Sequence, residues 1–230
     1  ADGYARISNH AVRVQDGKVT EDQDFELYRT GSLSGVVVNS DGAPVLNARV
    51  MARRRAGNNS PVPLTVGSAV SGEDGKFHIE SVEAGEETWL SVMSGQYLET
   101  ESASFNIEPG DHLEVGEVKL TLGGSISGQV VDPDGRGVPG ASVAIRTEEE
   151  TAFSAVKTAT TDRRGEFRIR GLVAGIIDLQ VKTTDFLEEI AQGVEVKEAS
   201  ETGDIRIELR RGNSFTGIVI DNNDRPVSGA

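Results

Sequence analysis

The 230-residue chain contains no cysteine, so disulfide bonds, cysteine-based zinc sites and thiol nucleophiles are excluded. Aromatic residues make up only 5% of the chain, and a core therefore has to be built mainly from aliphatic side chains. No apolar run approaches the length of about 20 residues that a membrane-spanning helix needs, which argues against membrane insertion. The sequence starts at Ala1 and shows no signal peptide, as we expect of an excerpt from a longer protein.

Positive charge is also scarce. Asp and Glu number 37 against 23 Lys and Arg, which gives a formal net charge of −14. Nucleic acids and anionic membrane surfaces are bound through clustered cations, so neither is an expected partner. The one basic cluster, Arg53–Arg55, is expected to be a solvated strand end or loop.

Residues that carry chemistry are few. The three histidines, His10, His78 and His112, lack the spacing of a metal-binding motif and are expected to be exposed single side chains. A GxSxG nucleophile elbow and a phosphate-binding loop with its lysine are both missing. The loops 39–42 and 132–137 place oxygen donors close together as calcium loops do, but their Asn and Asp side chains are expected to support their own turns. We therefore predict no enzymatic activity, no metal site and no cofactor.

Glycine, in contrast, is abundant, with 27 residues, and much of it recurs in a long internal repeat. One pattern of glycine, valine and alanine appears at residues 31–50, 124–143 and 212–230, and a second block appears at residues 71–85 and 161–175. The period of roughly 90 residues is too long for a solenoid repeat and suits separate small domains, each with its own core.

The order of the blocks predicts a division into four parts. Residues 30–122 and 123–210 are two complete repeats. Residues 1–29 are the C-terminal part of a preceding repeat, and residues 211–230 are the N-terminal part of a following one. The linkers between these parts are very short, which should limit movement between domains.

The local pattern within each repeat is that of short strands. Apolar residues alternate with small or polar ones, and Asp-Gly pairs at 41–42 and 134–135 are typical of hairpin turns. About seven short strands per repeat predict an all-β fold of tandem seven-stranded β-sandwiches. A single helical turn around residues 186–190 is the one helical feature that we expect.

The second repeat resembles the carboxypeptidase regulatory-like domain, a Greek-key sandwich of the transthyretin-like (prealbumin-like) type, related to immunoglobulin-like sandwiches. Its first block has the family pattern of a glycine, a turn and a Gly-Ala pair, and its second block has the Thr-Asp, Gly-x-Phe and Leu-x-x-Gly elements. The matching residues are Gly128, Val130, Asp132, Gly135, Val138, Gly140, Ala141, Val143, Thr161, Asp162, Gly165, Phe167, Leu172 and Gly175. The repeat departs from the pattern at Gly137, where the family favours proline, and at Asp185-Phe186, where it favours Gly-Tyr.

This resemblance implies a non-catalytic structural or spacer array within a larger exported or cell-surface protein. The expected location is extracellular, at the cell surface or periplasmic, and a bacterial source is expected. The expected partners are the neighbouring repeats of the same protein.

Two other functions remain open. The chain could be a carbohydrate- or protein-binding module, with Trp89 and Tyr97 as the candidate ligand-binding residues. Apolar residues near Leu179 and at Phe186 take their places in the second repeat, however, so core packing is the favoured role of both aromatics. The chain could also be the accessory region of a peptidase or transport receptor whose active part lies outside this sequence.

Overall fold

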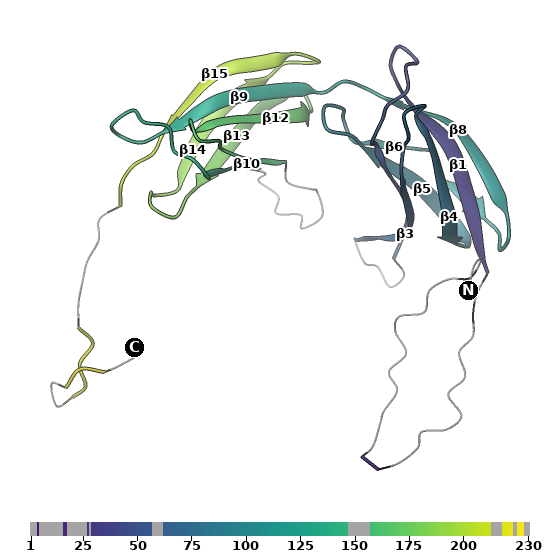
Figure 1. Ribbon diagram of the computed structural model, residues 1–230, viewed down its shortest axis with the longest axis horizontal. Coiled ribbons are helices and arrows are strands. Elements are labelled where there is room, and N and C mark those ends of the chain that lie inside the picture. The colour runs from purple at the N-terminus through teal and green to yellow at the C-terminus, as the bar shows by residue number, and fades with distance from the viewer. Residues whose placement is uncertain are drawn as a thin grey trace.

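The computed structural model describes residues 29–56, 62–146 and 157–212, together with residues 4, 16–17, 27, 218–222 and 225–227. Every regular element in these residues is a β-strand. They contain no helix that is long and apolar enough to cross a membrane. The strands form two sandwiches that follow one another along a curved line (Figure 1). The predicted all-β fold of tandem sandwiches is confirmed.

The first sandwich packs a three-stranded sheet, in the order β4-β1-β8, against a second sheet built on β3-β2-β5. The short strands β6 and β7 both pair with β5 and complete the second sheet. The strand bounds are β1 Thr30–Asn39, β2 Arg49–Arg55, β3 Pro63–Val70, β4 Lys76–Glu83, β5 Gly85–Met93, β6 Thr100–Glu101, β7 Phe105–Ile107 and β8 His112–Leu120.

The second sandwich repeats this arrangement with the sheets β12-β9-β15 and β11-β10-β13-β14. Its central strand β9 pairs antiparallel with β12 and parallel with β15, as β1 does with β4 and β8. The continuous strand β14 takes the place of the two pieces β6 and β7. The strand bounds are β9 Gly124–Val131, β10 Ser142–Arg146, β11 Thr158–Thr160, β12 Glu166–Leu172, β13 Gly175–Lys182, β14 Glu189–Val196 and β15 Glu201–Glu208.

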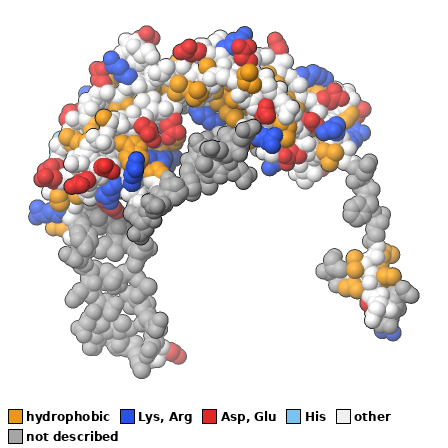
Figure 2. Space-filling model, turned by 180° about the vertical axis from the view of Figure 1, so that it is seen from behind, with side chains coloured by type: hydrophobic (Ala, Val, Ile, Leu, Met, Phe, Trp, Pro, Cys, Tyr) orange, Lys and Arg blue, Asp and Glu red, His pale blue; other side chains and the backbone are white. Residues whose placement is uncertain are grey.

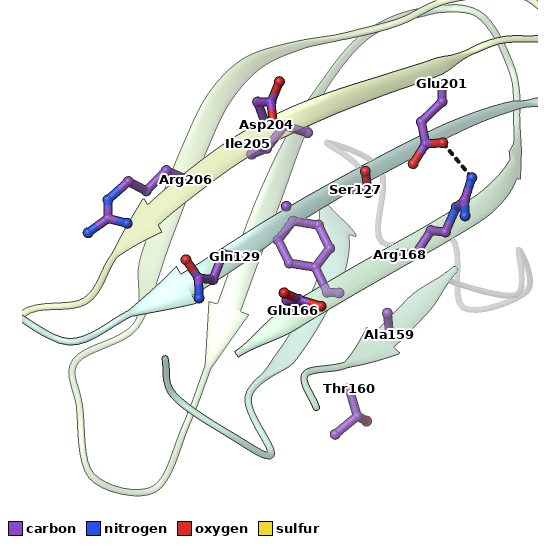
Figure 3. Close-up of a pocket in the computed structure, with 12 residues that line it drawn as sticks. Ser127, Gln129, Ala159, Thr160, Glu166, Arg168, Glu201, Asp204, Ile205 and Arg206 are labelled. Carbon is purple, nitrogen blue, oxygen red and sulfur yellow. Dashed lines mark hydrogen bonds and ion pairs between the residues drawn. The ribbon is translucent and has the colours of Figure 1, made fainter. Parts of the chain in front are cut away.

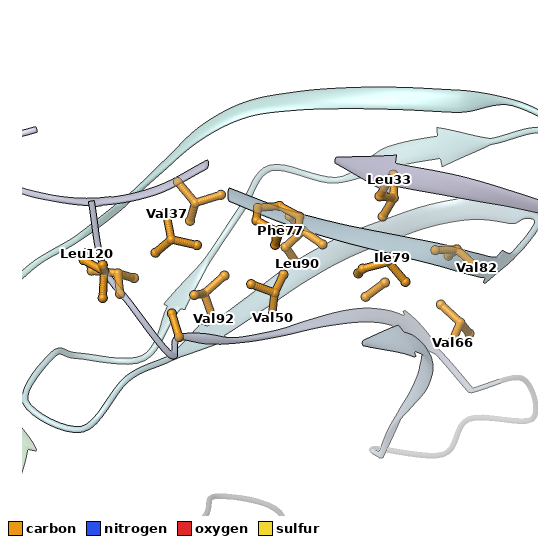
Figure 4. Packing of buried hydrophobic residues seen from close by; sticks show 14 of the residues in the cluster. Leu33, Val37, Val50, Val66, Phe77, Ile79, Val82, Leu90, Val92 and Leu120 are labelled. Carbon is orange, nitrogen blue, oxygen red and sulfur yellow. The ribbon is translucent and has the colours of Figure 1, made fainter. Parts of the chain in front are cut away.

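Each sandwich has its own aliphatic core, with one buried phenylalanine at an equivalent position. Figure 4 shows the core of the first sandwich, around Phe77. Phe77 and Phe167 are both almost fully buried, and each lies on the strand that pairs antiparallel with the central strand. Burial of a side chain of this size contributes about 1.5–3 kcal/mol to the free energy of folding. The alternating apolar residues of the repeat are those that point into this core. The largest fully buried side chains are Leu33, Leu90, Leu120, Ile126, Leu179 and Leu209.

A glycine at the turn before β4 and before β12 explains part of the second repeat block. Gly75 and Gly165 have φ values of +74° and +76°, a conformation that side chains disfavour. A Cβ atom would lie 2.5 Å from the Val37 carbonyl oxygen at Gly75 and 2.3 Å from the Val130 carbonyl oxygen at Gly165. Glycine is required at both positions because the turn packs directly on the backbone of the central strand.

A buried hydroxyl group supports the first block in each sandwich. Ser71 Oγ donates to the Val45 carbonyl oxygen at 2.6 Å and accepts from the Ala48 amide at 2.8 Å. Thr161 Oγ1 makes the same two contacts with Val138 and Ala141, at 2.7 and 2.8 Å. The hydroxyl therefore satisfies backbone groups that would otherwise be buried without partners.

The predicted helical turn at residues 186–190 is wrong. The chain bends at Phe186, whose amide donates to Thr183 Oγ1 at 3.0 Å, and β14 begins at Glu189. Phe186 packs against the second core, which favours an extended path into β14 over a helical turn.

The described residues 218–222 and 225–227 repeat a contact found in the two sandwiches. The Val227 amide donates to the Val219 carbonyl oxygen at 2.8 Å, as the Val45 amide donates to the Val37 carbonyl oxygen at 2.9 Å. The assignment of residues 211–230 to a following repeat stays a prediction. Most of residues 1–29, assigned to a preceding repeat, lie outside the described residues.

Candidate functional site

Trp89 lies on the outer face of the first sandwich rather than in its core. It is half-buried, it is opposite Arg53 on the neighbouring strand β2, and its Nε1 donates to Glu101 Oε1 at 3.3 Å. Thr88 and Leu90, which flank Trp89 on β5, point inward, and both are fully buried. The favoured core position of Trp89 is therefore wrong.

The error comes from a one-residue difference between the repeats. Leu90 is opposite Ala52, and Leu179 is opposite the equivalent Ile145, so Leu90 rather than Trp89 is the counterpart of Leu179. The counterpart of Trp89 is Asp178. Because the side chains of a strand alternate between its two faces, a shift of one residue moves a side chain from the core to the surface.

The surroundings of Trp89 are unusually apolar for an outer face. Met51 is 5% exposed and Met93 is half-buried, and both lie on this face by their pairing with Ser91 and Arg49. Arg53 donates from Nη2 to Met51 Sδ at 3.7 Å, while its Nε is buried without a hydrogen-bond partner. We refer to Met51, Arg53, Trp89 and Met93 as the Trp89 face.

The basic cluster next to this face is only partly solvated. Arg55 is exposed, as expected, but Arg54 donates to the Ala84 carbonyl oxygen at 2.7 Å and pairs with Glu83 at 3.1 Å. Acidic and basic side chains are interspersed over the described part of the molecule seen in Figure 2. In that view the described residues form no broad basic surface.

Tyr97 packs against the core of the first sandwich, in agreement with its favoured role, and Phe186 does the same in the second. Tyr97 is half-buried in the turn after β5, where it forms a bridge with Leu122. Trp89 faces outward and Tyr97 faces the core, so the structure does not join them on one surface. Ligand binding by either residue stays a prediction.

The turn that carries Tyr97 also forms the junction between the two sandwiches. The Leu98 amide donates to the Thr121 carbonyl oxygen at 2.9 Å, and the Gly123 amide donates to the Gln96 carbonyl oxygen at 3.0 Å. The linker between β8 and β9 is thus hydrogen-bonded to the first sandwich at Thr121 and at Gly123.

The second sandwich contacts this turn through Gly171. A Cβ atom at Gly171 would lie 2.5 Å from the Tyr97 carbonyl oxygen, and one at Gly123 would lie 2.6 Å from the Gly171 backbone. Lys157 Nζ donates to the Gly171 carbonyl oxygen at 2.6 Å. Burial lowers the pKa of Lys157, and the nearby Glu99 carboxylate partly opposes this effect. Neither Lys157 nor Gly171 could be singled out from the sequence, because their role depends on contact between the two sandwiches.

A hollow of about 660 Å³ lies on the sheet β12-β9-β15 (Figure 3). It is open to solvent, and three of its polar side chains contact other groups of the protein. Arg168 pairs with Glu201, and Gln129 donates to the Arg164 carbonyl oxygen at 2.7 Å.

The acidic loops use their side chains in their own turns. Asp132 Oδ1 accepts from the amides of Asp134 and Arg136 at 2.9 and 2.8 Å. Asn39 Oδ1 accepts in the same way from Asp41 and Ala43. The interpretation of these loops as self-supported turns is confirmed. Within the described ranges, no group of three or more His, Asp or Glu side chains is arranged to hold a metal ion.

Two of the three histidines lie together. His78 on β4 and His112 on β8 flank the central strand β1, and their ring centroids are 5.7 Å apart. The expectation of exposed single histidines is therefore corrected for this pair. His78 and His112 are 34 residues apart in the sequence, and their contact can be recognised only once the strand order β4-β1-β8 is known. His10 lies outside the described residues.

Several solved structures show a distant likeness to this chain. The minor pilin of Streptococcus agalactiae has a TM-score of 0.36 at 11% identity, covering 82% of this chain and 99% of the pilin. The shaft pilin of Lactobacillus rhamnosus GG has a TM-score of 0.38 at 8% identity, covering 81% and 100%. A cohesin–X-dockerin complex of Acetivibrio cellulolyticus has a TM-score of 0.30 at 18% identity, covering 40% and 58%. Such low scores bear on neither function nor partners.

No curated protein matches the sequence. The carboxypeptidase regulatory-like domain matches it twice, over residues 32–121 and 125–210. These ranges include the strands and core of each sandwich, and together they span well over half of the chain. The chain therefore belongs to the carboxypeptidase regulatory-like domain family.

Proposed function

We propose that this chain is a non-catalytic spacer within a larger exported or cell-surface protein, in which two sandwiches are held in a fixed relation. The observation that carries this proposal is the junction between them. A flexible tether would leave the linker backbone in solvent, whereas this linker is hydrogen-bonded to the first sandwich at both Thr121 and Gly123.

The packing at the junction supports a fixed angle. Gly171 has a φ value of +68° and touches the Tyr97 backbone, and Lys157 covers the same point. The close approach leaves no room for a side chain at Gly171. A spacer of this kind acts by setting distance and direction between its neighbours, so its partners are the adjoining repeats.

The proposal is tested by NMR relaxation of the two sandwiches. We expect their amides to report one common rotational correlation time. Gly171→Ala should loosen the junction and separate the two correlation times. Gly116→Ala is the matched control, because Gly116 also has a positive φ, +73°, but has no atom within 4 Å of its missing Cβ. Independent tumbling of the two sandwiches in the unchanged protein would overturn the proposal.

A binding function is the second candidate, and the Trp89 face favours it. Its half-buried tryptophan and two methionines lie beside an arginine Nε that lacks a partner. Aromatic rings of this kind stack on sugars or anchor protein partners.

Trp89 is the only tryptophan, so its fluorescence reports directly on this face. Soluble oligosaccharides should shift or quench the emission in a saturable way if the face binds carbohydrate. An unchanged spectrum across such a series would argue against carbohydrate as its ligand. A role as the accessory region of a peptidase or transport receptor stays a prediction that depends on flanking sequence.

A further inference from the structure

The outer face of the sheet β4-β1-β8 brings together two histidines, two serines and a glutamate. In the strand register, Ser34 on the central strand is opposite His78 on one side and Glu114 on the other. Ser32, two residues earlier, is opposite His112. The side chains share one face because strand residues at a spacing of two point the same way.

We propose that His78 and His112 form a two-imidazole chelate for a divalent transition-metal ion. Their ring centroids are 5.7 Å apart with a tilt of 39° between the planes. Two imidazoles on one ion, each with a metal–nitrogen distance of about 2.1 Å, have ring centres roughly 5–6 Å apart. Both rings are exposed, so an ion can reach them from solvent.

The hydrogen bonds around His112 fit this role. Ser34 Oγ donates to Glu114 Oε2 at 2.6 Å, so the contact of 2.9 Å between Ser34 Oγ and His112 Nε2 requires the ring to donate there. Ser32 Oγ lies 2.9 Å from Nδ1. When a metal binds Nε2, the ring proton moves to Nδ1 and is donated to Ser32 Oγ, without a net change in charge.

This outer-sphere arrangement is typical of metal-binding histidines, whose second nitrogen donates to a fixed acceptor. Ser34 is released from Nε2 when the ion enters. Glu114, to which Ser34 Oγ donates, lies beside the chelate and supplies negative charge near the ion. Nitrogen ligands favour zinc, copper or nickel over calcium and magnesium, which select oxygen.

The second sandwich holds different residues at the same positions. Arg168 replaces His78 and Glu201 replaces His112, with Ser127 in the place of Ser34 (Figure 3). Arg168 and Glu201 form an ion pair across the central strand. The register therefore brings these two positions into contact in both sandwiches, and the first fills them with metal-binding side chains.

The test is calorimetric titration of the folded chain with Zn²⁺ at neutral pH, combined with NMR of the histidine rings. We expect saturable binding of one ion and shifts of two ring systems. His78→Gln and His112→Gln should each weaken binding at least about tenfold. Glutamine keeps the polarity of the position, and amide spectra of each variant check that the sandwich is folded.

His10→Gln is the matched control and should leave zinc affinity unchanged. A mixture with excess Ca²⁺ should also leave it unchanged, which separates the site from general attraction to the acidic surface. The proposal is overturned if Zn²⁺ produces no saturable binding. Binding that persists in the double variant of His78 and His112, or that depends on His10, would overturn it equally.

Discussion

The outer face of β5 carries Trp89 in the first sandwich, whereas the equivalent position on β13 carries Asp178 in the second. The neighbouring Ser91 and Gln180 differ in type but make the same contact, each with a glutamate of the following segment, Glu99 or Glu188. The cores and strand orders of the two sandwiches agree. The residue types on the inner faces of the sheets are therefore restricted by core packing, whereas those on the outer faces differ between the two sandwiches.

The largest expected effect concerns the core and tests the placement of Trp89. Leu90→Ala and Leu179→Ala should each lower the free energy of unfolding of their own sandwich by about 2–5 kcal/mol, because both side chains are fully buried. Trp89→Ala should have a smaller effect, on the order of 1 kcal/mol. Urea unfolding followed by NMR of each sandwich measures these changes. A larger loss for Trp89→Ala than for Leu90→Ala would contradict the assignment of the two faces.

An intermediate effect is expected for the buried hydroxyls. Ser71→Ala and Thr161→Val remove the donor and acceptor that satisfy backbone groups in equivalent turns. Each should cost about 1–3 kcal/mol of stability in its own sandwich. Thermal unfolding measures this, with the exposed Ser68→Ala as a control that should change little. Equal stability of Ser71→Ala and Ser68→Ala would show that the two turns are supported differently.

The smallest expected effect lies at the junction, where the second sandwich supplies the partly buried Lys157. Burial lowers the pKa of Lys157 below the usual value of 10.5, so just below pH 10.5 the unfolded chain binds more protons than the folded one. Stability should therefore rise slightly with pH in this window. Lys157→Met should remove this rise while keeping the aliphatic stem. The measurement is urea unfolding across the alkaline range, and an identical pH slope in both proteins would argue against this account.

Much of the fold could be predicted because the same pattern of core and turn residues occurs in both repeats. Val37 and Val130, Phe77 and Phe167, and the turn glycines recur at equivalent positions, and each is explained by a local strand or turn. The place of Trp89 could not be predicted by counting residues. Leu90 follows Gly85 by one residue more than Leu179 follows Gly175, and the extra residue enters near Glu87, which has a φ value of 50°.

Repeated β-sandwiches with aliphatic cores follow from the amino-acid sequence alone, since alternation and turn chemistry are local properties. The contacts between residues of different strands and of different sandwiches follow only from the three-dimensional fold. His78 meets His112 because β1 lies between β4 and β8, and Gly171 meets Tyr97 because the short linker folds back on the first sandwich. Both contacts depend on long-range pairing, which no local pattern in the chain specifies.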